Sequence, residues 1–327
     1  MKQRAHLTLI NAIAAMCAVG ASLGVGLAYE SAPTKSAGTF TGQLVDLPAS
    51  ACVDRVSPCR GLYDASDTPV PVKHFSRVAS GNIVADGLLL ALAEPDRIAA
   101  FSPYANELAA NHRFAGRPHL AALEDVEGLL NLQPDLFIVS SMSDRAHIRR
   151  LRDAGVAVFD LGPMEGLSTL QGNINTLSQL LGAPERGQAL LAQVNRRLDA
   201  LARGGRLPWR AIYVGIHGDK MYGGTVGSSL HDVIVAAGLQ DAAEAKFHGW
   251  PAYTHEDLLA IDPDVVLTQV GMGTKLCKHP GLDQLTACRK PDRFVELPAS
   301  LLTDPGLAVI DAAEALASII RQRALAP

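Results

Sequence analysis

The sequence predicts an α/β protein that consists of two related halves joined by a long helical segment. Short apolar runs of strand length alternate with amphipathic helix patterns on both sides of residues 166–203, which favours parallel strands with helices over both faces of each sheet. Within residues 166–203, leucine, isoleucine and valine recur at spacings of three and four, as on one face of a helix. The third observation is a repeat: a glutamate, Pro-Asp seven residues later and then an apolar run occur once in each half.

The bulk composition limits the class of protein. The chain has 327 residues, which favours two domains, and its hydrophobic content of 48% is sufficient for packed cores. The formal net charge is -4 and no block of like charges occurs, whereas a nucleic-acid-binding protein usually carries a basic face. The composition therefore argues against a nucleic-acid partner.

Residues 1–28 have the layout of a secretory signal peptide. Lys2 and Arg4 precede an apolar stretch of small residues, which ends in a small-x-small site at residues 26–28. A membrane anchor is the alternative because the stretch is nearly long enough to span a bilayer, but its Ala and Gly content favours export. A lipoprotein would use Cys17, and the preceding Ala-Ala-Met is a poor lipobox. We therefore expect export without a lipid anchor.

Four cysteines remain after residue 28. They are Cys52, Cys59, Cys277 and Cys288. Four cysteines allow three pairings, and we expect the two local ones, Cys52 with Cys59 and Cys277 with Cys288, because disulfides persist outside the cytosol. Free buried thiols and a zinc site are the alternatives, but there is no Cys-x-x-Cys motif and neither pair has the tight spacing of metal ligands.

The predicted elements follow in order along the chain. Residues 29–74 are rich in Pro, Ser, Thr, Gly and Ala without periodicity, so we expect an irregular N-terminal extension. The first lobe, residues 75–165, has strands at 75–80, 98–104, 136–141 and 156–162, with helices at 86–98, before Pro134 and at 144–155. We expect residues 166–203 to form one long helix, or two nearly collinear helices that meet at residues 182–185, where Pro184 suits a first turn. The second lobe, residues 204–327, has strands at 210–216, 264–270 and 293–298, with helices at 228–238, 254–262 and 306–323.

Ligands of parallel sheets lie beyond the carboxyl ends of the strands. In the first lobe these ends are residues 80–82, 102–104 and 140–143. The candidate ligand-binding residues there are Asn82, Tyr104, Ser141 and Met142.

Catalytic motifs are missing from the sequence. After the expected signal peptide it has no GxSxG elbow, no Walker loop and no HExxH. A secreted hydrolase that uses Ser228 or Ser229 with His231 is the enzymatic alternative, and the missing nucleophile elbow argues against it. The glycine-rich residues 223–229 could hold an anion on backbone amides, but a tight turn explains them more simply.

Histidines and aromatic residues are candidates for binding a metal complex, since neutral imidazole suits transition metals and haem iron. His119, His217 and His248 fall in predicted loops on the side of the strand ends. Residues 247–253, FHGWPAY, place three aromatic side chains together in a chain with 5% aromatic residues. The segment suits a large planar or apolar ligand, and an aromatic cluster in the core of the lobe is the equal alternative.

From about residue 75 to its end, the sequence resembles the periplasmic solute-binding proteins of ABC importers for metal chelates. The resemblance rests on the order and spacing of RVASGNIVADGLLLALAEPDRIAAFSPY, EGLLNLQPDLFIVSS, WPAYTHEDLLAIDPDVVLT and a tail with LP, DPG and AAEALA. It implies two Rossmann-like lobes with parallel sheets, joined by a single rigid long helix, with the ligand cleft between the lobes. It also implies a monomeric periplasmic receptor without enzymatic activity or cofactor, which delivers an iron-siderophore, haem or cobalamin to a permease dimer in the inner membrane.

The resemblance further assigns residues to permease docking. In this family each lobe offers the permease a surface glutamate on the helix before the Pro-Asp strand. The matching residues of this sequence are Glu127 and Glu256.

The nature of the cargo stays open among three classes. The segment with Trp250 is similar to one in cobalamin binders, but Ala121 stands where those proteins have a tryptophan in the first lobe. Haem binders tend to have a tyrosine at the place of Leu120, and His119 stands next to it. Siderophore binders often use arginines against anionic chelates, and Arg117 of this sequence is available for that role. The ligand-binding candidates in full are Asn82, Tyr104, Arg117, His119, Ser141, Met142, His217, Tyr222, His248, Trp250, Tyr253 and Met272, with His119 and His248 as candidate metal ligands. The alternative function within the same fold is capture of free Zn or Mn ions by several of His112, His119, His217 and His248.

Overall fold

The structure of the protein is a computed structural model, which describes residues 43–107 and 114–324. The expected signal peptide at residues 1–28 and the metal-ligand candidate His112 lie outside the described residues. Within the described ranges, none of the helices combines the length and the apolar character that crossing a membrane requires.

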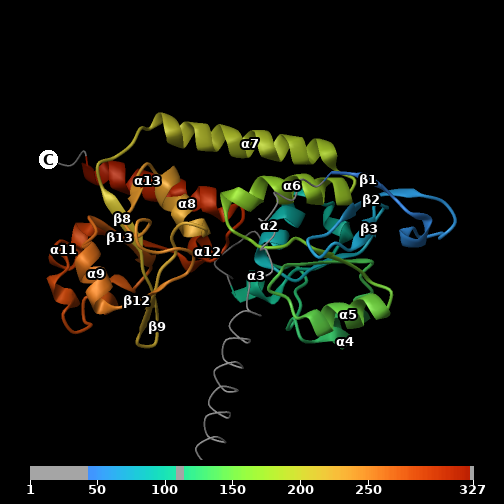
Figure 1. Ribbon diagram of the computed structural model, residues 1–327, viewed down its shortest axis with the longest axis horizontal. Coiled ribbons are helices and arrows are strands. Elements are labelled where there is room, and N and C mark those ends of the chain that lie inside the picture. Colours follow the sequence, from blue (N-terminus) through green and yellow to red (C-terminus); the bar gives the residue numbers. More distant parts are fainter. Residues whose placement is uncertain (1–42, 108–113, 325–327) are drawn as a thin grey trace, which may run out of the picture. The chain divides into compact units, whose positions relative to one another are not determined.

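The first lobe, drawn in teal to green in Figure 1, is built on a four-stranded parallel sheet with the order β5-β4-β6-β7. Its strands are β4 (Val78–Ser80), β5 (Ile98–Ala100), β6 (Leu136–Val139) and β7 (Ala157–Asp160). Its helices are α2 (Ile83–Leu92), the 3-10 turn η2 (Pro95–Arg97), α3 (Pro103–Glu107), α4 (Val126–Asn131) and α5 (Arg145–Asp153). The alternation of strands and helices read from the sequence is confirmed.

The second lobe repeats this topology with the order β11-β8-β13-β14, again parallel. Its strands are β8 (Arg210–Tyr213), β11 (Gln240–Asp241), β13 (Val265–Gln269) and β14 (Phe294–Leu297). A small antiparallel sheet joins β9 (Gly215–His217), β10 (Lys220–Tyr222) and β12 (Ala252–Tyr253). The helical elements are α8 (Ser229–Ala236), α9 (His255–Ile261), α10 (Gly273–Leu276), η4 (Leu282–Gln284), α11 (Thr286–Arg289), η5 (Pro291–Arg293), α12 (Ala299–Leu302) and α13 (Ala308–Ala324).

The repeated Pro-Asp is explained by the same set of contacts in each lobe. The carboxylate of Asp135 accepts the backbone N–H of Arg77 at 3.0 Å, at the start of β4. The carboxylate of Asp264 accepts that of Arg210 at 2.8 Å, at the start of β8. Each arginine side chain also donates to a carbonyl at the end of the helix that precedes the Pro-Asp. The acceptor is Leu132 for Arg77 and residues 261–262 for Arg210. The Pro-Asp therefore fastens the helix, the strand that follows it and the neighbouring first strand together in both lobes.

The linking segment differs from the sequence expectation. It forms two helices, α6 (Leu167–Leu180) and α7 (Pro184–Arg203), which pack side by side and antiparallel instead of in line. Gln171 of α6 donates to Asn195 of α7 at 3.2 Å. The chain reverses because Gly182, with a φ of +69°, takes the left-handed conformation that glycine tolerates. A single long helix, α7, then runs between the lobes, as the predicted fold class requires, and contacts α2 and α13.

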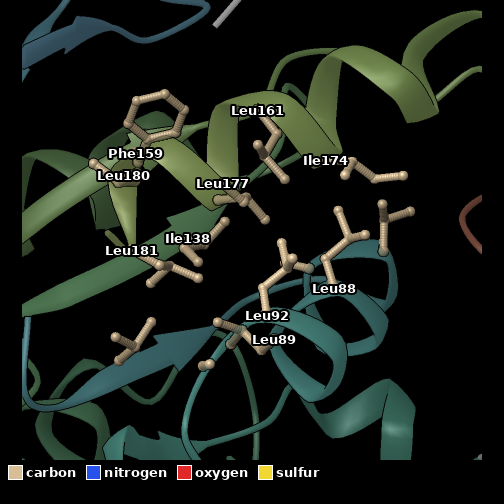
Figure 2. Close-up of a cluster of buried hydrophobic side chains, with 14 of the residues drawn as sticks. Leu88, Leu89, Leu92, Ile138, Phe159, Leu161, Ile174, Leu177, Leu180 and Leu181 are labelled. Atoms are coloured by element: carbon tan, nitrogen blue, oxygen red, sulfur yellow. The ribbon is translucent and has the colours of Figure 1, made fainter. Parts of the chain in front are cut away.

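The core of the first lobe holds the α6–α7 pair in place. Leu88 and Leu92 of α2 lie opposite Ile174 and Leu177 of α6 (Figure 2). All four side chains are fully buried. Burying one such side chain contributes about 1.5–3 kcal/mol to stability, so α6 is a fixed part of this lobe.

The N-terminal extension is also more regular than expected. Strands β1 (Val45–Leu47), β2 (Cys59–Tyr63) and β3 (Pro69–Pro71) form an antiparallel sheet, and η1 (Ala49–Ala51) lies between the first two. Leu62 and Val70 are buried in the core of the first lobe. Residues 43–74, called the N-terminal strap below, are thus a folded addition to this lobe. Strands of three to five residues are too short to show a period in the sequence, and β3 also contains two prolines.

Both predicted disulfides are confirmed. Cys52 bonds to Cys59 and Cys277 bonds to Cys288, with S–S distances of 2.17 and 2.07 Å. The second bond closes a loop that contains the buried Leu282 and Leu285.

Removal of the Cys277–Cys288 bond is expected to destabilise the protein. Because a loop of this length loses conformational entropy when it is cross-linked in the unfolded chain, Cys277→Ser with Cys288→Ser should lower the free energy of unfolding by about 2–4 kcal/mol. Urea unfolding under oxidising conditions measures this loss. Cys52→Ser with Cys59→Ser is the matched control, with a smaller loss because its loop is shorter. Equal unfolding midpoints for wild type and the Cys277/Cys288 variant would contradict the expectation.

Candidate ligand site at the strand ends

The candidates of the first lobe lie in the loops that follow its parallel strands. Tyr104 in α3 is 45% exposed, and Met142 after β6 is 87% exposed. Ser141 is exposed beside Met142. Asn82 is buried and caps α2, because its side chain accepts the N–H of Ala85 at 2.8 Å. The Nδ2 atom of Asn82 is buried without a hydrogen-bond partner, so this residue shapes the loop and keeps one free donor.

A buried acid, which the sequence analysis missed, fixes the loop that carries Tyr104. Asp86 of α2 accepts the N–H of Ser102 at 2.9 Å and the Ser102 hydroxyl at 2.5 Å. Both residues are fully buried. Burial raises the pKa of Asp86 to about 6, against the lowering effect of the two Ser102 hydrogen bonds. An acid inside the apolar run VADGLLLAL was the available signal in the sequence.

His119 lies against the edge strand of the first sheet. Phe101 and His119 form an isolated parallel bridge, and their rings are 6.0 Å apart between centroids. The Nε2 atom of His119 is buried without a hydrogen-bond partner. Arg117, two residues earlier, is half-buried. The His119 imidazole is therefore held next to the strand ends with one ring nitrogen unpaired.

The candidates of the second lobe separate into exposed and buried groups. Trp250 is 60% exposed, and His217 and His248 are exposed as well. Tyr222 and Met272 are half-buried. Trp250 lies in the loop between β11 and β12, two residues before β12 of the small antiparallel sheet.

Tyr253 instead lies in the core of the second lobe. It is 5% exposed, and its ring packs edge-on against Phe247 at 5.2 Å. Its hydroxyl has no hydrogen-bond partner, and burial, with the nearby Asp241 and Asp257, raises its pKa. The aromatic segment thus divides: Tyr253 and Phe247 belong to the core alternative, while Trp250 faces solvent.

Four exposed apolar side chains follow strands of the two parallel sheets. Tyr104, Met142, Trp250 and Val270 are all among the exposed large hydrophobic side chains of the described residues. Two follow strands of the first lobe and two lie in the corresponding part of the second. Exposed apolar groups of this kind mark a binding surface when they collect in one region.

The enzymatic alternative lacks the contacts it needs. His231 Nδ1 lies 2.8 Å from Asp241 Oδ2, and that carboxylate also accepts the Thr225 hydroxyl at 2.6 Å. The hydroxyl of Ser228 is buried without a hydrogen-bond partner, so it is not bonded to His231. Ser229 is 3% exposed. Neither Ser228 nor Ser229 is therefore presented to solvent as an activated serine.

The two predicted docking glutamates occupy equivalent positions. Glu127 and Glu256 are exposed, and each is the second residue of its helix, α4 or α9. Asp125 caps α4 by accepting the N–H of Gly128 at 2.8 Å. Thr254 caps α9 in a capping box. Capping fixes both first turns, so each carboxylate projects from a rigid helix start.

Comparisons with known proteins identify the fold and family of these lobes. A family model described as periplasmic binding protein matches residues 78–301. The uncharacterized ABC transporter substrate-binding lipoprotein YvrC of Bacillus subtilis (strain 168) is 24% identical over 205 residues, which are 60% of this chain and 65% of that protein.

Solved structures show the same architecture. The apo form of the periplasmic heme-binding protein RhuT from Roseiflexus sp. RS-1 is 26% identical with a TM-score of 0.64, over 75% of this chain and 98% of that one. The periplasmic heme-binding protein BhuT in complex with two hemes is 26% identical with a TM-score of 0.62, over 76% and 100%.

Proposed function

The chain belongs to the periplasmic binding protein family, and we propose that it is the substrate-binding component of an ABC importer, which captures a metal complex between its lobes and delivers it to a membrane permease. The observation that carries this proposal is the set of exposed apolar side chains at the strand ends of two lobes with the same topology: Tyr104, Met142, Trp250 and Val270. A receptor of this kind binds and releases its cargo without covalent chemistry.

Haem is the cargo class that the site supports best among haem, cobalamin and iron-siderophores. Flat aromatic side chains and a thioether, as in Tyr104, Trp250 and Met142, suit a planar apolar ring. The two solved structures described above are of proteins that are named as heme-binding. His119 and His248 are the candidate ligands for the metal of the cargo; His248 is exposed, and His119 has a buried Nε2 without a hydrogen-bond partner.

Free Zn or Mn capture is not favoured. Among the residues that the structure describes, no group of three or more His, Cys, Asp or Glu side chains lies close enough to hold one metal ion. His217 and His248 lie at exposed positions of the second lobe, whereas His119 lies in the first lobe.

The protein is exported from the cytoplasm, as its membership of the periplasmic binding protein family supports. Removal of residues 1–28 as a signal peptide and the division of the remainder at residues 75, 166 and 204 are part of the proposal. The expectation that a lipid anchor is absent finds no support, since the relative YvrC is a lipoprotein.

Fluorescence titration tests the proposed function. The chain has two tryptophans: Trp209 stacks under Arg293 at 4.8 Å in the second lobe, and Trp250 is exposed. Haemin should quench the fluorescence saturably at micromolar concentration or below, and cobalamin and ferric siderophores should quench it more weakly.

The variants place the cargo within the site. Trp250→Phe should remove the quenching, while Trp209→Phe should retain it; His119→Ala and His248→Ala should report on the metal ligand through the haem absorption spectrum. Absence of a saturable response to all three cargo classes would refute the proposed function. A stronger response to a siderophore than to haemin would retain the receptor and change its cargo.

A further inference from the structure

The N-terminal strap is attached to the first lobe through a buried carboxylate. Asp64, which is 2% exposed, accepts hydrogen bonds on Oδ2 from Arg152 Nη2 of α5 at 2.8 Å and from the N–H of Asp160 at 3.3 Å. Its Oδ1 accepts the N–H groups of Ser66 and Thr68 at 2.8 Å each. Asp64 thus joins the turn between β2 and β3 to α5 and β7.

A second carboxylate carries the attachment to the end of β7. Asp160 Oδ2 accepts hydrogen bonds from Ser66 Oγ at 2.7 Å and from Arg145 Nη1 at 2.9 Å. Its Oδ1 accepts the N–H of Gly162 at 2.8 Å, and the N–H of Ala65 donates to the Asp160 carbonyl at 2.9 Å. One residue therefore links the strap to Gly162, just beyond the carboxyl end of β7.

Gly162 connects this network to the loop that carries Met142. The carbonyl of Gly162 accepts the N–H of Ser141 at 3.1 Å, and Met142 is the next residue. A Cβ at Gly162, whose φ is +79°, would lie 2.9 Å from the Cβ of Ala65. The strap is therefore in direct contact with the backbone that holds the loop at residues 140–143.

We propose that the N-terminal strap is a positioning element of the cargo site, which fixes the loop at residues 140–143 through Asp64 and Asp160. Asp160 is 1% exposed, and a buried carboxylate that loses a donor is left incompletely paired, which is costly. Of the two side chains that donate to its Oδ2, one belongs to the strap. The loop therefore keeps its geometry only while the strap is docked. The proposal rests on the proposed function only where cargo affinity is concerned.

Spin labelling tests the proposal directly. A label at Met142→Cys, in the full chain with Cys17→Ser, reports on the loop, because the other four cysteines are disulfide-bonded. Ser66→Ala and Asp160→Asn should each make this label more mobile and speed amide exchange at Ser141 about tenfold. Ser57→Ala, at an exposed position of the same strap, is the matched control.

The outcomes separate this inference from the proposed function. A label on Gln193→Cys of α7 should stay unchanged in every variant, which shows that the lobe remains folded. Unchanged mobility at position 142 in both network variants would overturn the inference, whether or not any cargo binds. Greater mobility with unaltered haemin affinity would also overturn it, since the strap would then stabilise the lobe without positioning the site. Greater mobility, together with haemin affinity at least threefold weaker in the unlabelled variants that keep Met142, would support it.

Discussion

Loss of both docking glutamates should strongly reduce delivery of the cargo while binding is retained. In Glu127→Ala with Glu256→Ala, uptake through the permease should fall about tenfold or more, and the haemin titration should be unchanged. Each exposed ion pair contributes only about 0.2–1 kcal/mol, but a pair of charges on two rigid lobes also fixes orientation and raises the encounter rate. Uptake into vesicles that contain the permease measures the effect.

The geometry supports a joint role for the two residues. Glu127 and Glu256 are the second residues of capped helices, and both helices are fastened to the sheet by the same arginine and Pro-Asp contacts. Their spacing is therefore set by the fold and not by flexible side chains alone. The matched control is Glu165→Ala with Glu185→Ala, which removes two exposed acids elsewhere. Normal uptake by the Glu127/Glu256 variant would count against docking at these sites.

The fold was predictable because local patterns are repeated and consistent. The Pro-Asp that follows each helix marks a contact that recurs in both lobes, so it appears twice in the sequence. The direction of the linking helices was not predictable, since leucine periodicity fixes helical faces and the reversal depends on Gly182 adopting a positive φ. The strap was missed because its strands are too short to show a period and because it docks on residues distant in sequence, Asp160 and Arg152.

The exposure of the candidate site residues was only partly predictable from the sequence. The rule that ligands lie beyond the strand ends located Tyr104 and Met142, which the structure leaves exposed. The same rule cannot separate Trp250 from Tyr253, three residues apart, because packing against Phe247 decides which one is buried. Aromatic residues are identified by sequence, whereas their burial is decided by tertiary contacts.

Asp86 should make the stability of the protein fall as the pH rises from about 4 to about 6. Its pKa is raised from 3.8 to about 6 in the folded state because burial penalises the charged form. A proton is therefore held more tightly by the folded than by the unfolded chain, so the stabilisation is complete below pH 4 and lost above pH 6. A pKa difference of this size corresponds to about 3 kcal/mol.

Asp86→Asn isolates this effect from the other titrating groups. The amide can accept the Ser102 N–H and donate to the Ser102 hydroxyl, as a protonated carboxyl would, and it carries no charge at any pH. The free energy of unfolding of the variant, relative to wild type, should therefore increase by about 3 kcal/mol between pH 4 and pH 7 in urea titrations. Asp144→Asn is the control, and its change in the free energy of unfolding with pH should have the opposite sign. Two backbone N–H groups lower the pKa of the exposed N-cap residue Asp144. A constant difference between Asp86→Asn and wild type across this range would mean that Asp86 stays charged in the folded protein, and that the Ser102 hydrogen bonds outweigh the cost of its burial.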